Sequence, residues 1–208
     1  DATTEESTST QAVETTEETA AAEEEAAFPL TVTDQVGGEV TIEEEPQTLV
    51  SGYYISTSLL IALGQEDKLV GIEAKADTRE LYKLAAPELP SLPNVGSLKQ
   101  FNLETCVSTE PDLVILSAKV PDAVAKLEEL GIPVIAVNPE SEKEFKETIS
   151  MIGTACNVQE RANELTESYD KAIADLAAKL EGVEPARVYL GGNSAFLSTA
   201  GPAMFQDL

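Results

Sequence analysis

Residues 111–137 read PDLVILSAKVPDAVAKLEELGIPVIAV, and they carry the clearest evidence for the fold class. The apolar run LVIL at 113–116 is typical of a strand that is buried on both faces. A second apolar run follows at 132–137. Between them, Pro121 suits the first turn of a helix, and apolar residues fall on one face of that helix: Val124, Leu127 and Leu130. The order strand, helix, strand predicts a parallel βαβ unit.

The same alternation continues toward the start of the chain. Residues 30–33 and 39–42 alternate apolar and polar side chains around a Gly-rich turn, which predicts a β-hairpin. Short apolar runs at 49–51 and 69–72 predict two more strands, with a helix at about 55–63 between them. Strands that alternate with helices predict an α/β fold built on a doubly wound parallel sheet.

Downstream of residue 137, short strands and helices no longer alternate. Ser141 and Glu144 form a capping box for one more helix. Residues 158–180 then carry an apolar stripe in steps of three and four, which predicts a helix of about 35 Å that packs along a surface. A fresh strand is predicted at 187–190, and the chain stops at Leu208 in what reads as a helix start. We therefore expect a second α/β unit that begins and does not finish, as in a truncated chain.

The acidic start of the chain is predicted to be a disordered tether. Residues 1–27 hold nine acids and no base, with Thr, Ser and Ala supplying nearly all the rest. Such a segment buries too little apolar surface to offset its ordering entropy. The alternative is a terminal tail without a role. The predicted divisions are a tether at 1–27, an α/β lobe at 28–156, a connecting helix at 157–183 and the start of a second lobe at 184–208.

Composition excludes several classes of function. With 38 acidic and 13 basic residues the formal charge is −25, which argues against nucleic acid as a partner. The chain has no His, so Ser-His-Asp and Cys-His nucleophile systems and imidazole metal sites are excluded. No apolar run reaches the roughly 18 residues that a membrane-spanning helix needs. No charged-then-apolar leader is present, so we expect any export signal to have been removed already.

Motifs for phosphate binding and nucleophilic catalysis are absent. Gly37-Gly38 belongs to the predicted hairpin, and the GGNS at 191–194 has neither of the phosphate-loop spacings. Gly192-x-Ser194 suggests a nucleophile elbow, but position 196 is Phe and no His partner exists. An enzyme active site is therefore poorly supported, and an α/β enzyme fragment is kept only as an alternative.

Cys106 and Cys156 are interpreted as buried small hydrophobes, with a disulfide as the other option.

Scarce cations follow the predicted strands. Ligands of open α/β sheets bind beyond the carboxyl ends of the strands. Several cations and two tyrosines are predicted to lie at that edge. They are Tyr53 and Tyr54 after 49–51, Lys75 and Arg79 after 69–72, Lys119 after 113–116, and Lys99 just before a helix capped by Asn102. In so acidic a chain, this predicts an anionic ligand with flat or aromatic parts. The alternatives are that these are ordinary solvated loop cations, and that the two tyrosines are partly buried over the first helix.

Several motifs, in order, resemble those of one transport family. They include Leu92-Pro93-Asn94-Val95-Gly96, Glu110-Pro111-Asp112-Leu113-Val114-Ile115 and Leu130-Gly131-Ile132-Pro133-Val134. The chain resembles the iron-siderophore, haem and cobalamin substrate-binding proteins of ABC importers over about residues 30–208. The resemblance implies two α/β lobes joined by one rigid helix, small closure on binding, and a lipid anchor just upstream of Asp1.

The resemblance also implies site residues, matched position by position. The implied ligand-binding positions are Tyr53, Tyr54, Ile55, Lys75, Arg79, Leu98, Lys99, Ser117, Lys119 and, in the second lobe, Asn193. Family members use a Glu on each lobe to engage the permease, and Glu104 stands at that position; its other interpretation is a carboxylate favoured by its own helix N-terminus. Cobalamin binders place aromatic rings where Lys75, Leu98 and Ser117 stand here, so the pattern favours a ferric siderophore.

The resulting hypothesis is a monomeric, extracytoplasmic lipoprotein that captures a ferric complex and delivers it to an ABC permease and its ATPase. It predicts no catalysis, no resident cofactor or metal, and no contact with nucleic acid. Cobalamin or haem binding by the same fold is the second hypothesis. A non-catalytic surface interaction domain, which binds no small molecule, is the third.

Overall fold

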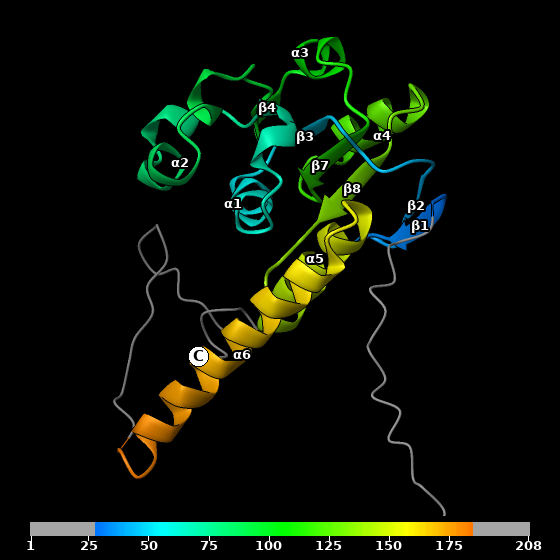
Figure 1. Ribbon diagram of the computed structural model, residues 1–208. Helices are drawn as coiled ribbons and strands as arrows, with labels where there is room; N and C mark the ends of the chain where they lie inside the picture. Colours follow the sequence, from blue (N-terminus) through cyan, green and yellow to red (C-terminus); the bar gives the residue numbers. More distant parts are fainter. Residues whose placement is uncertain (1–27, 185–208) are drawn as a thin grey trace, which may run out of the picture.

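The computed structural model describes residues 28–184 (Figure 1). The predicted tether at 1–27, the predicted strand at 187–190 and the predicted site residue Asn193 lie outside the described residues. The predicted division into lobes is therefore not tested, although the expected α/β class is present. No helix within residues 28–184 is both long enough and apolar enough to cross a membrane.

A four-stranded parallel sheet forms the centre of the fold. Its strands are β3 (Leu49–Ser51), β4 (Leu69–Ile72), β7 (Leu113–Ser117) and β8 (Val134–Val137), in the spatial order β4-β3-β7-β8. Side chains of β7 alternate between two separate apolar cores, with Leu113 and Ile115 in one and Val114 and Leu116 in the other. This is why the strand reads as an unbroken apolar run: both of its faces are buried.

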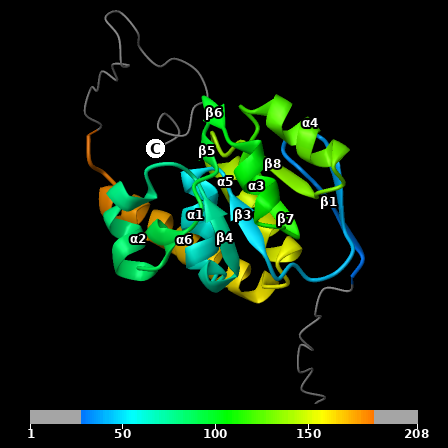
Figure 2. The ribbon, with the colours of Figure 1, turned by 90° about the horizontal axis from the view of Figure 1, so that it is seen from above.

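Helices cover both faces of the sheet (Figure 2). One core receives side chains from α1 (Tyr54–Ala62) and α5 (Glu142–Ala155), and the other from α3 (Leu103–Ser108) and α4 (Pro121–Glu129). The doubly wound arrangement is thus confirmed. One detail of the prediction is wrong: Leu130 is 57% exposed rather than buried with Leu127. The helix has already ended at Glu129, so helical spacing no longer turns Leu130 toward the sheet.

Short elements occupy the connections. The predicted hairpin is present as β1 (Leu30–Thr33) and β2 (Glu39–Ile42), and 3₁₀ turns occur at Glu66–Lys68, Ala76–Thr78 and Leu89–Ser91. Helix α2 (Glu80–Ala85) and the small hairpin β5 (Gly96–Ser97) and β6 (Gln100–Phe101) were not expected from the sequence. They are too short to show a periodicity, yet they build part of the site described below.

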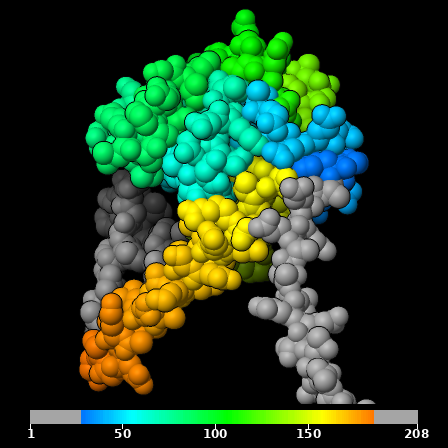
Figure 3. Space-filling model, viewed as in Figure 1, coloured from blue at the N-terminus to red at the C-terminus, as the bar shows by residue number. Residues whose placement is uncertain are grey.

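The long helix is α6 (Gln159–Leu180), which leaves the sheet and extends away from it (Figures 1 and 3). It meets α5 where Gly153 packs against Ala162, so closely that a Cβ on Gly153 would lie 2.4 Å from that of Ala162. Along the predicted stripe, Ala162 is buried, whereas Leu176 and Leu180 are about half exposed. The stripe therefore packs against the described residues only over its first turns.

Predicted caps and the buried cysteines are confirmed. The Asn102 side chain accepts a hydrogen bond from the backbone of Thr105 at 3.0 Å, and Ser141 accepts one from Glu144 at 3.3 Å. Cys106 and Cys156 are both free and buried, in the two different cores. Burial raises the pKa of Cys106 to about 11, so its thiol stays protonated at neutral pH.

Asp112 gives the fold a predictable sensitivity to acid. Its carboxylate accepts the backbone N–H groups of Gln47 and Thr48 at 2.8 and 2.9 Å. Partial burial acts to raise the pKa of Asp112, but these hydrogen bonds outweigh it and hold the pKa below its usual range. The stabilisation is therefore complete above the unfolded-state pKa of about 3.9 and is lost as the pH falls through the folded-state value.

We expect Asp112→Asn to flatten the acid side of the stability profile, because an amide oxygen still accepts the two N–H groups but does not titrate. Denaturant unfolding between pH 7 and pH 2.5 measures this. Glu43→Gln, an exposed position directly after β2, is the control and should leave the slope unchanged. Equal slopes for the Asp112 variant and the parent would contradict the assignment.

Candidate functional site

A cavity of about 390 Å³ opens at the carboxyl ends of β3 and β4. Its wall is completed by the tip of the β5–β6 hairpin. The residues that line it are Gly52, Tyr53, Tyr54, Glu73, Ala74, Lys75, Arg79, Gly96, Ser97, Leu98 and Lys99. Three cations and one carboxylate thus face this cavity, in a chain whose formal charge is −25.

Arg79 is the most constrained of the three cations. Its Nε donates to the Glu73 carboxylate at 3.2 Å. Its guanidinium carbon lies 4.6 Å from the centre of the Tyr54 ring and 5.7 Å from that of Tyr82. Both distances are within the range of cation–π attraction. The guanidinium is therefore held by one charge and two rings.

Lys75 occupies an unusual backbone conformation, with φ at 68°. This left-handed region is unfavourable for a residue with a Cβ. Two backbone hydrogen bonds hold Lys75 in this conformation. The Ala74 N–H donates to the Gly96 carbonyl at 2.6 Å, and the Thr78 N–H donates to the Lys75 carbonyl at 3.0 Å. The exposed ammonium of Lys75 is thus carried by a strained turn at the mouth of the cavity.

The two adjacent tyrosines differ in environment. Tyr53 is buried at 8% exposure, whereas Tyr54 is 44% exposed, and their rings meet edge to face with centres 5.0 Å apart. Burial raises the pKa of Tyr53 to about 12, with the charge of nearby groups as a smaller cause. The Tyr53 phenol is therefore neutral at physiological pH. Of the pair, Tyr54 is the one available to stack on a ligand.

Six of the residues singled out from the sequence line this one cavity: Tyr53, Tyr54, Lys75, Arg79, Leu98 and Lys99. Three others do not. Ile55 packs against the apolar core, and Ser117 is buried, with its hydroxyl accepting the N–H of Lys119 at 3.3 Å. Their positions next to strand ends led to the prediction, but their side chains point into the protein instead.

Lys119 is the third. It lines a neighbouring cavity of about 350 Å³ that also contacts Leu98 and Lys99, and its ammonium forms an ion pair with Glu140. That carboxylate comes from the segment after β8, so the pairing could not be read from the sequence around Lys119. Lys119 therefore adds little net positive charge to this edge of the sheet.

Glu73 is a site residue that the sequence analysis missed. It follows β4 directly and is 6% exposed. Its carboxylate accepts hydrogen bonds from the Thr57 hydroxyl at 2.7 Å and from the Tyr82 hydroxyl at 2.8 Å. A signal was present, since an acidic residue two positions before Lys75 stands out among the cations of that loop. Its burial, however, depends on α1 and α2, and α2 was not expected from the sequence.

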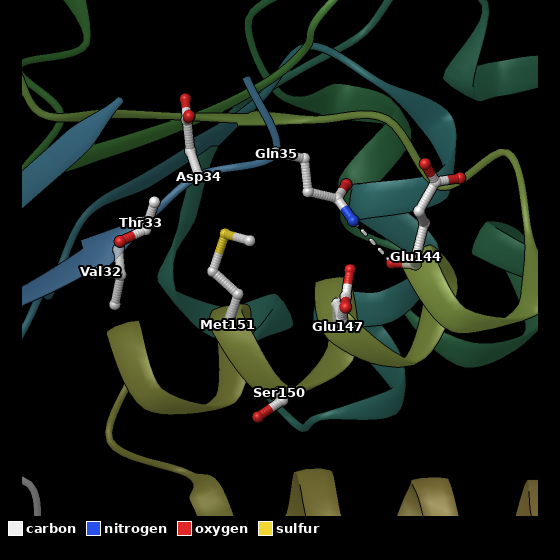
Figure 4. Close-up of a pocket in the computed structure, with 8 residues that line it drawn as sticks. All are labelled: Val32, Thr33, Asp34, Gln35, Glu144, Glu147, Ser150 and Met151. Atoms are coloured by element: carbon white, nitrogen blue, oxygen red, sulfur yellow. Dashed lines mark hydrogen bonds between the residues drawn. The ribbon is translucent and has the colours of Figure 1, made fainter. Parts of the chain in front are cut away.

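A separate cavity of about 410 Å³ lies between the β1–β2 hairpin and α5 (Figure 4). Its lining includes three acids, Asp34, Glu144 and Glu147, and no cation. The Gln35 amide donates to the Glu144 carbonyl at 2.7 Å across it. Asp34 is occupied by the N–H groups of Val36, Gly38 and Ala136. These contacts attach the hairpin to the sheet, and the local charge opposes an anionic ligand.

No set of three or more His, Cys, Asp or Glu side chains within residues 28–184 is placed to hold a metal ion. The arrangement consists of a doubly wound sheet, a cavity at the carboxyl ends of its strands, and one long helix that leaves the lobe. This is the architecture of an α/β solute-binding lobe.

Comparison with known proteins identifies the family. The pattern of the periplasmic binding protein family matches residues 49–205, and the chain belongs to that family. It is 33% identical over 162 residues to the uncharacterized ABC transporter substrate-binding lipoprotein YvrC of Bacillus subtilis, covering 75% of this chain and 49% of YvrC. The chain thus spans about half the length of that relative.

Solved structures agree on the fold. The molybdate-bound protein MolA of Haemophilus influenzae superposes with a TM-score of 0.71 at 21% identity, over 79% of this chain and 58% of MolA. The siderophore-binding protein BauB, bound to acinetobactin and ferric iron, superposes with a TM-score of 0.64 at 20% identity, over 79% of this chain and 59% of BauB.

Proposed function

We propose that this chain belongs to an extracytoplasmic, lipid-anchored substrate-binding protein that captures a ferric siderophore and delivers it to an ABC permease and its ATPase. The observation that carries the proposal is the cavity that Lys75, Arg79 and Lys99 line together with the partly exposed Tyr54, whose ring lies against the Arg79 guanidinium. The proposed protein acts as a monomer, performs no catalysis and needs no resident cofactor or metal.

The charge of the cavity favours an anionic ligand. Three cations face one carboxylate there, and Glu73 is already engaged by Arg79. Elsewhere the chain is strongly acidic, so this positive site is a local feature that attracts an anion against a repulsive background. Ferric siderophore complexes are commonly anionic, and their flat chelating groups suit a tyrosine face flanked by a guanidinium.

The size of the cavity helps to choose among ligands. A volume of about 390 Å³ in one lobe is far larger than a small oxyanion requires, and apolar side chains such as Leu98 contribute to its wall. Among the relatives, BauB binds a ferric siderophore and MolA binds molybdate. The mixed aromatic and cationic lining supports the larger chelate.

Haem capture is the second candidate, and exposed Tyr54 is the observation that favours it, because a tyrosine can ligate haem iron. Tyr53 is unsuited to that role, since it is buried and its pKa is raised to about 12.

Thermal shift measurements on the full chain with a ferric catecholate, a ferric hydroxamate, haem, cobalamin and molybdate test the proposal. A ligand present at 100 times its Kd should stabilise the protein by about 2.7 kcal/mol. A rise in Tm with one ferric chelate supports the proposal. A rise in Tm only with haem, cobalamin or molybdate would show that the ligand is of that class and not a ferric siderophore. No rise with any of them would favour the interaction-domain hypothesis.

Glu104 is proposed to contact the permease. It is exposed in the first turn of α3 and lies outside the residues that line the ligand cavity. We expect Glu104→Ala to leave ligand affinity unchanged and to slow uptake by severalfold, because a lost rim charge weakens docking without touching the ligand. Uptake into vesicles that contain the cognate transporter measures this, with exposed Glu128→Ala on α4 as the control. Normal uptake by the Glu104 variant would remove it from the docking role.

A further inference from the structure

Glu73 conflicts with the charge of the cavity that it lines. A carboxylate next to an anion site repels the ligand and is costly to bury. Glu73 is nevertheless only 6% exposed. A group that opposes binding directly is retained in this position only if it contributes something else, so its contacts indicate its role.

The Glu73 carboxylate accepts hydrogen bonds from three side chains, and both of its oxygens are used. Thr57 of α1 lies 2.7 Å from one oxygen. Tyr82 of α2 donates to the other at 2.8 Å, and Arg79 donates to that same oxygen through Nε at 3.2 Å. Thr57 and Tyr82 are themselves buried, so these two donors fix the carboxylate rigidly before Arg79 is added.

Arg79 is the most exposed member of this group, and Glu73 limits its freedom. Its side chain is 35% exposed, which leaves a long, flexible cation at the cavity wall. Among residues 28–184, the hydrogen bond that its side chain makes is the one from Nε to Glu73. The two terminal amino groups are therefore left over, while two tyrosine rings flank the guanidinium plane.

We propose that Glu73 is a positioning residue that holds the Arg79 guanidinium against Tyr54, so that its terminal amino groups face the cavity as a preformed clamp for an anionic ligand. This inference rests on the proposed function and adds the element that orders its site. A guanidinium with an ordered edge offers two parallel donors to a carboxylate or catecholate oxygen pair. Ordering it in advance removes the entropy cost from the binding step.

The proposal makes a prediction of opposite sign to that of simple electrostatics. Removing a negative charge beside an anion site strengthens binding if the charge is all that matters. If Glu73 acts by holding Arg79, Glu73→Gln instead weakens binding, because the guanidinium loses its charged partner. We expect the Kd of the full chain for the ferric complex of 2,3-dihydroxybenzoate, measured by titration calorimetry, to rise about tenfold. An unchanged or lower Kd would overturn the proposal.

Two variants separate positioning from general disruption of the buried network. Tyr82→Phe removes the hydroxyl that donates to the same carboxylate oxygen and also lies 3.1 Å from the Tyr54 carbonyl oxygen. It leaves the Arg79 contact, so the Kd should change by less than about threefold. In an Arg79→Gln background, Glu73→Gln should no longer weaken binding, because nothing remains to be positioned. A Tyr82→Phe loss as large as that of Glu73→Gln, or additive losses in the double variant, would assign Glu73 a merely structural role.

A measurement without ligand keeps this test independent of the proposed function. In NMR spectra, the Nε–H of Arg79 should give a resonance protected from solvent exchange in the parent chain and in Tyr82→Phe, and should lose that protection in Glu73→Gln. Retained protection in Glu73→Gln would refute the positioning role. If the parent chain does not bind the ferric probe, that form of the proposed function fails, while the Nε–H signal still decides the role of Glu73.

Discussion

Replacing Gly96 with alanine is expected to lower the free energy of unfolding by about 3 kcal/mol. Gly96 has φ at +93°, and a Cβ there would lie 2.2 Å from the Gln100 carbonyl oxygen and 2.9 Å from the Asn102 nitrogen. Both neighbours are backbone atoms, which cannot rotate away as a flexible side chain can. The tight β5–β6 hairpin must therefore open to accept the methyl group.

Gly131→Ala is the matched control for this prediction. Gly131 also has a positive φ, at +76°, but a Cβ there meets nothing within 4 Å. It should cost only the conformational term, about 1 kcal/mol. Denaturant unfolding of both variants isolates the steric clash as their difference. Equal losses would show that the hairpin can relax and that the close approach at Gly96 is unimportant.

The Gly96 variant should also impair the site. Gly96 lines the cavity, its carbonyl accepts the Ala74 N–H at 2.6 Å, and the hairpin that it starts carries Leu98 and Lys99. Opening the hairpin moves one wall of the cavity away from the strand ends. Weaker binding of a ferric chelate is expected for Gly96→Ala and unchanged binding for Gly131→Ala, which lies outside the cavity lining.

Removing the cavity cations should lower the affinity for an anionic ligand by about tenfold for each charge removed, at low ionic strength. The appropriate pair is Lys75→Asn with Lys99→Gln. Asparagine is chosen because Lys75 has φ at 68°, a conformation that Asn tolerates better than Ala. The variant then changes the charge without adding new backbone strain. The loss should shrink as salt is added, because mobile ions screen exposed charges.

Lys119→Gln is the control, since the ammonium of Lys119 is already paired with Glu140 and lies outside this cavity. It should change the Kd by much less than the double variant. Isothermal titration calorimetry at two salt concentrations measures the Kd of the parent chain, the double variant and Lys119→Gln. An affinity loss that is independent of salt, or as large in Lys119→Gln, would contradict the electrostatic account of the site.

The sequence alone determined the class of fold, because the signals for it are local. Apolar runs at 113–116 and 132–137 are short and rich in β-branched residues, which favours strands with both faces covered, and the observed strands are Leu113–Ser117 and Val134–Val137. The helix between them carries its own start and stop signals. The order of these elements then allows few topologies. The caps at Asn102 and Ser141 were equally readable, since a cap and its helix are neighbours in the chain.

The sequence also indicated which edge of the sheet carries the site. Residues that follow parallel strands gather at one edge whatever the details of packing. Of the nine predicted ligand residues that lie within residues 28–184, six line a single cavity. Ile55 and Ser117 were misplaced because one residue along the backbone separates a side chain that faces the cavity from one that faces the core.

The pairing of the charges depends on the tertiary structure. The Lys119–Glu140 ion pair joins the ends of two strands, and the burial of Glu73 requires Thr57 from one helix and Tyr82 from another. The cavity wall comes from a hairpin whose paired segments have two residues each. Desolvation and Coulomb energies depend on distance in space, which sequence separation does not encode. The pattern of the chain therefore fixes where cations gather, and the packing of the fold fixes which of them remain free to bind.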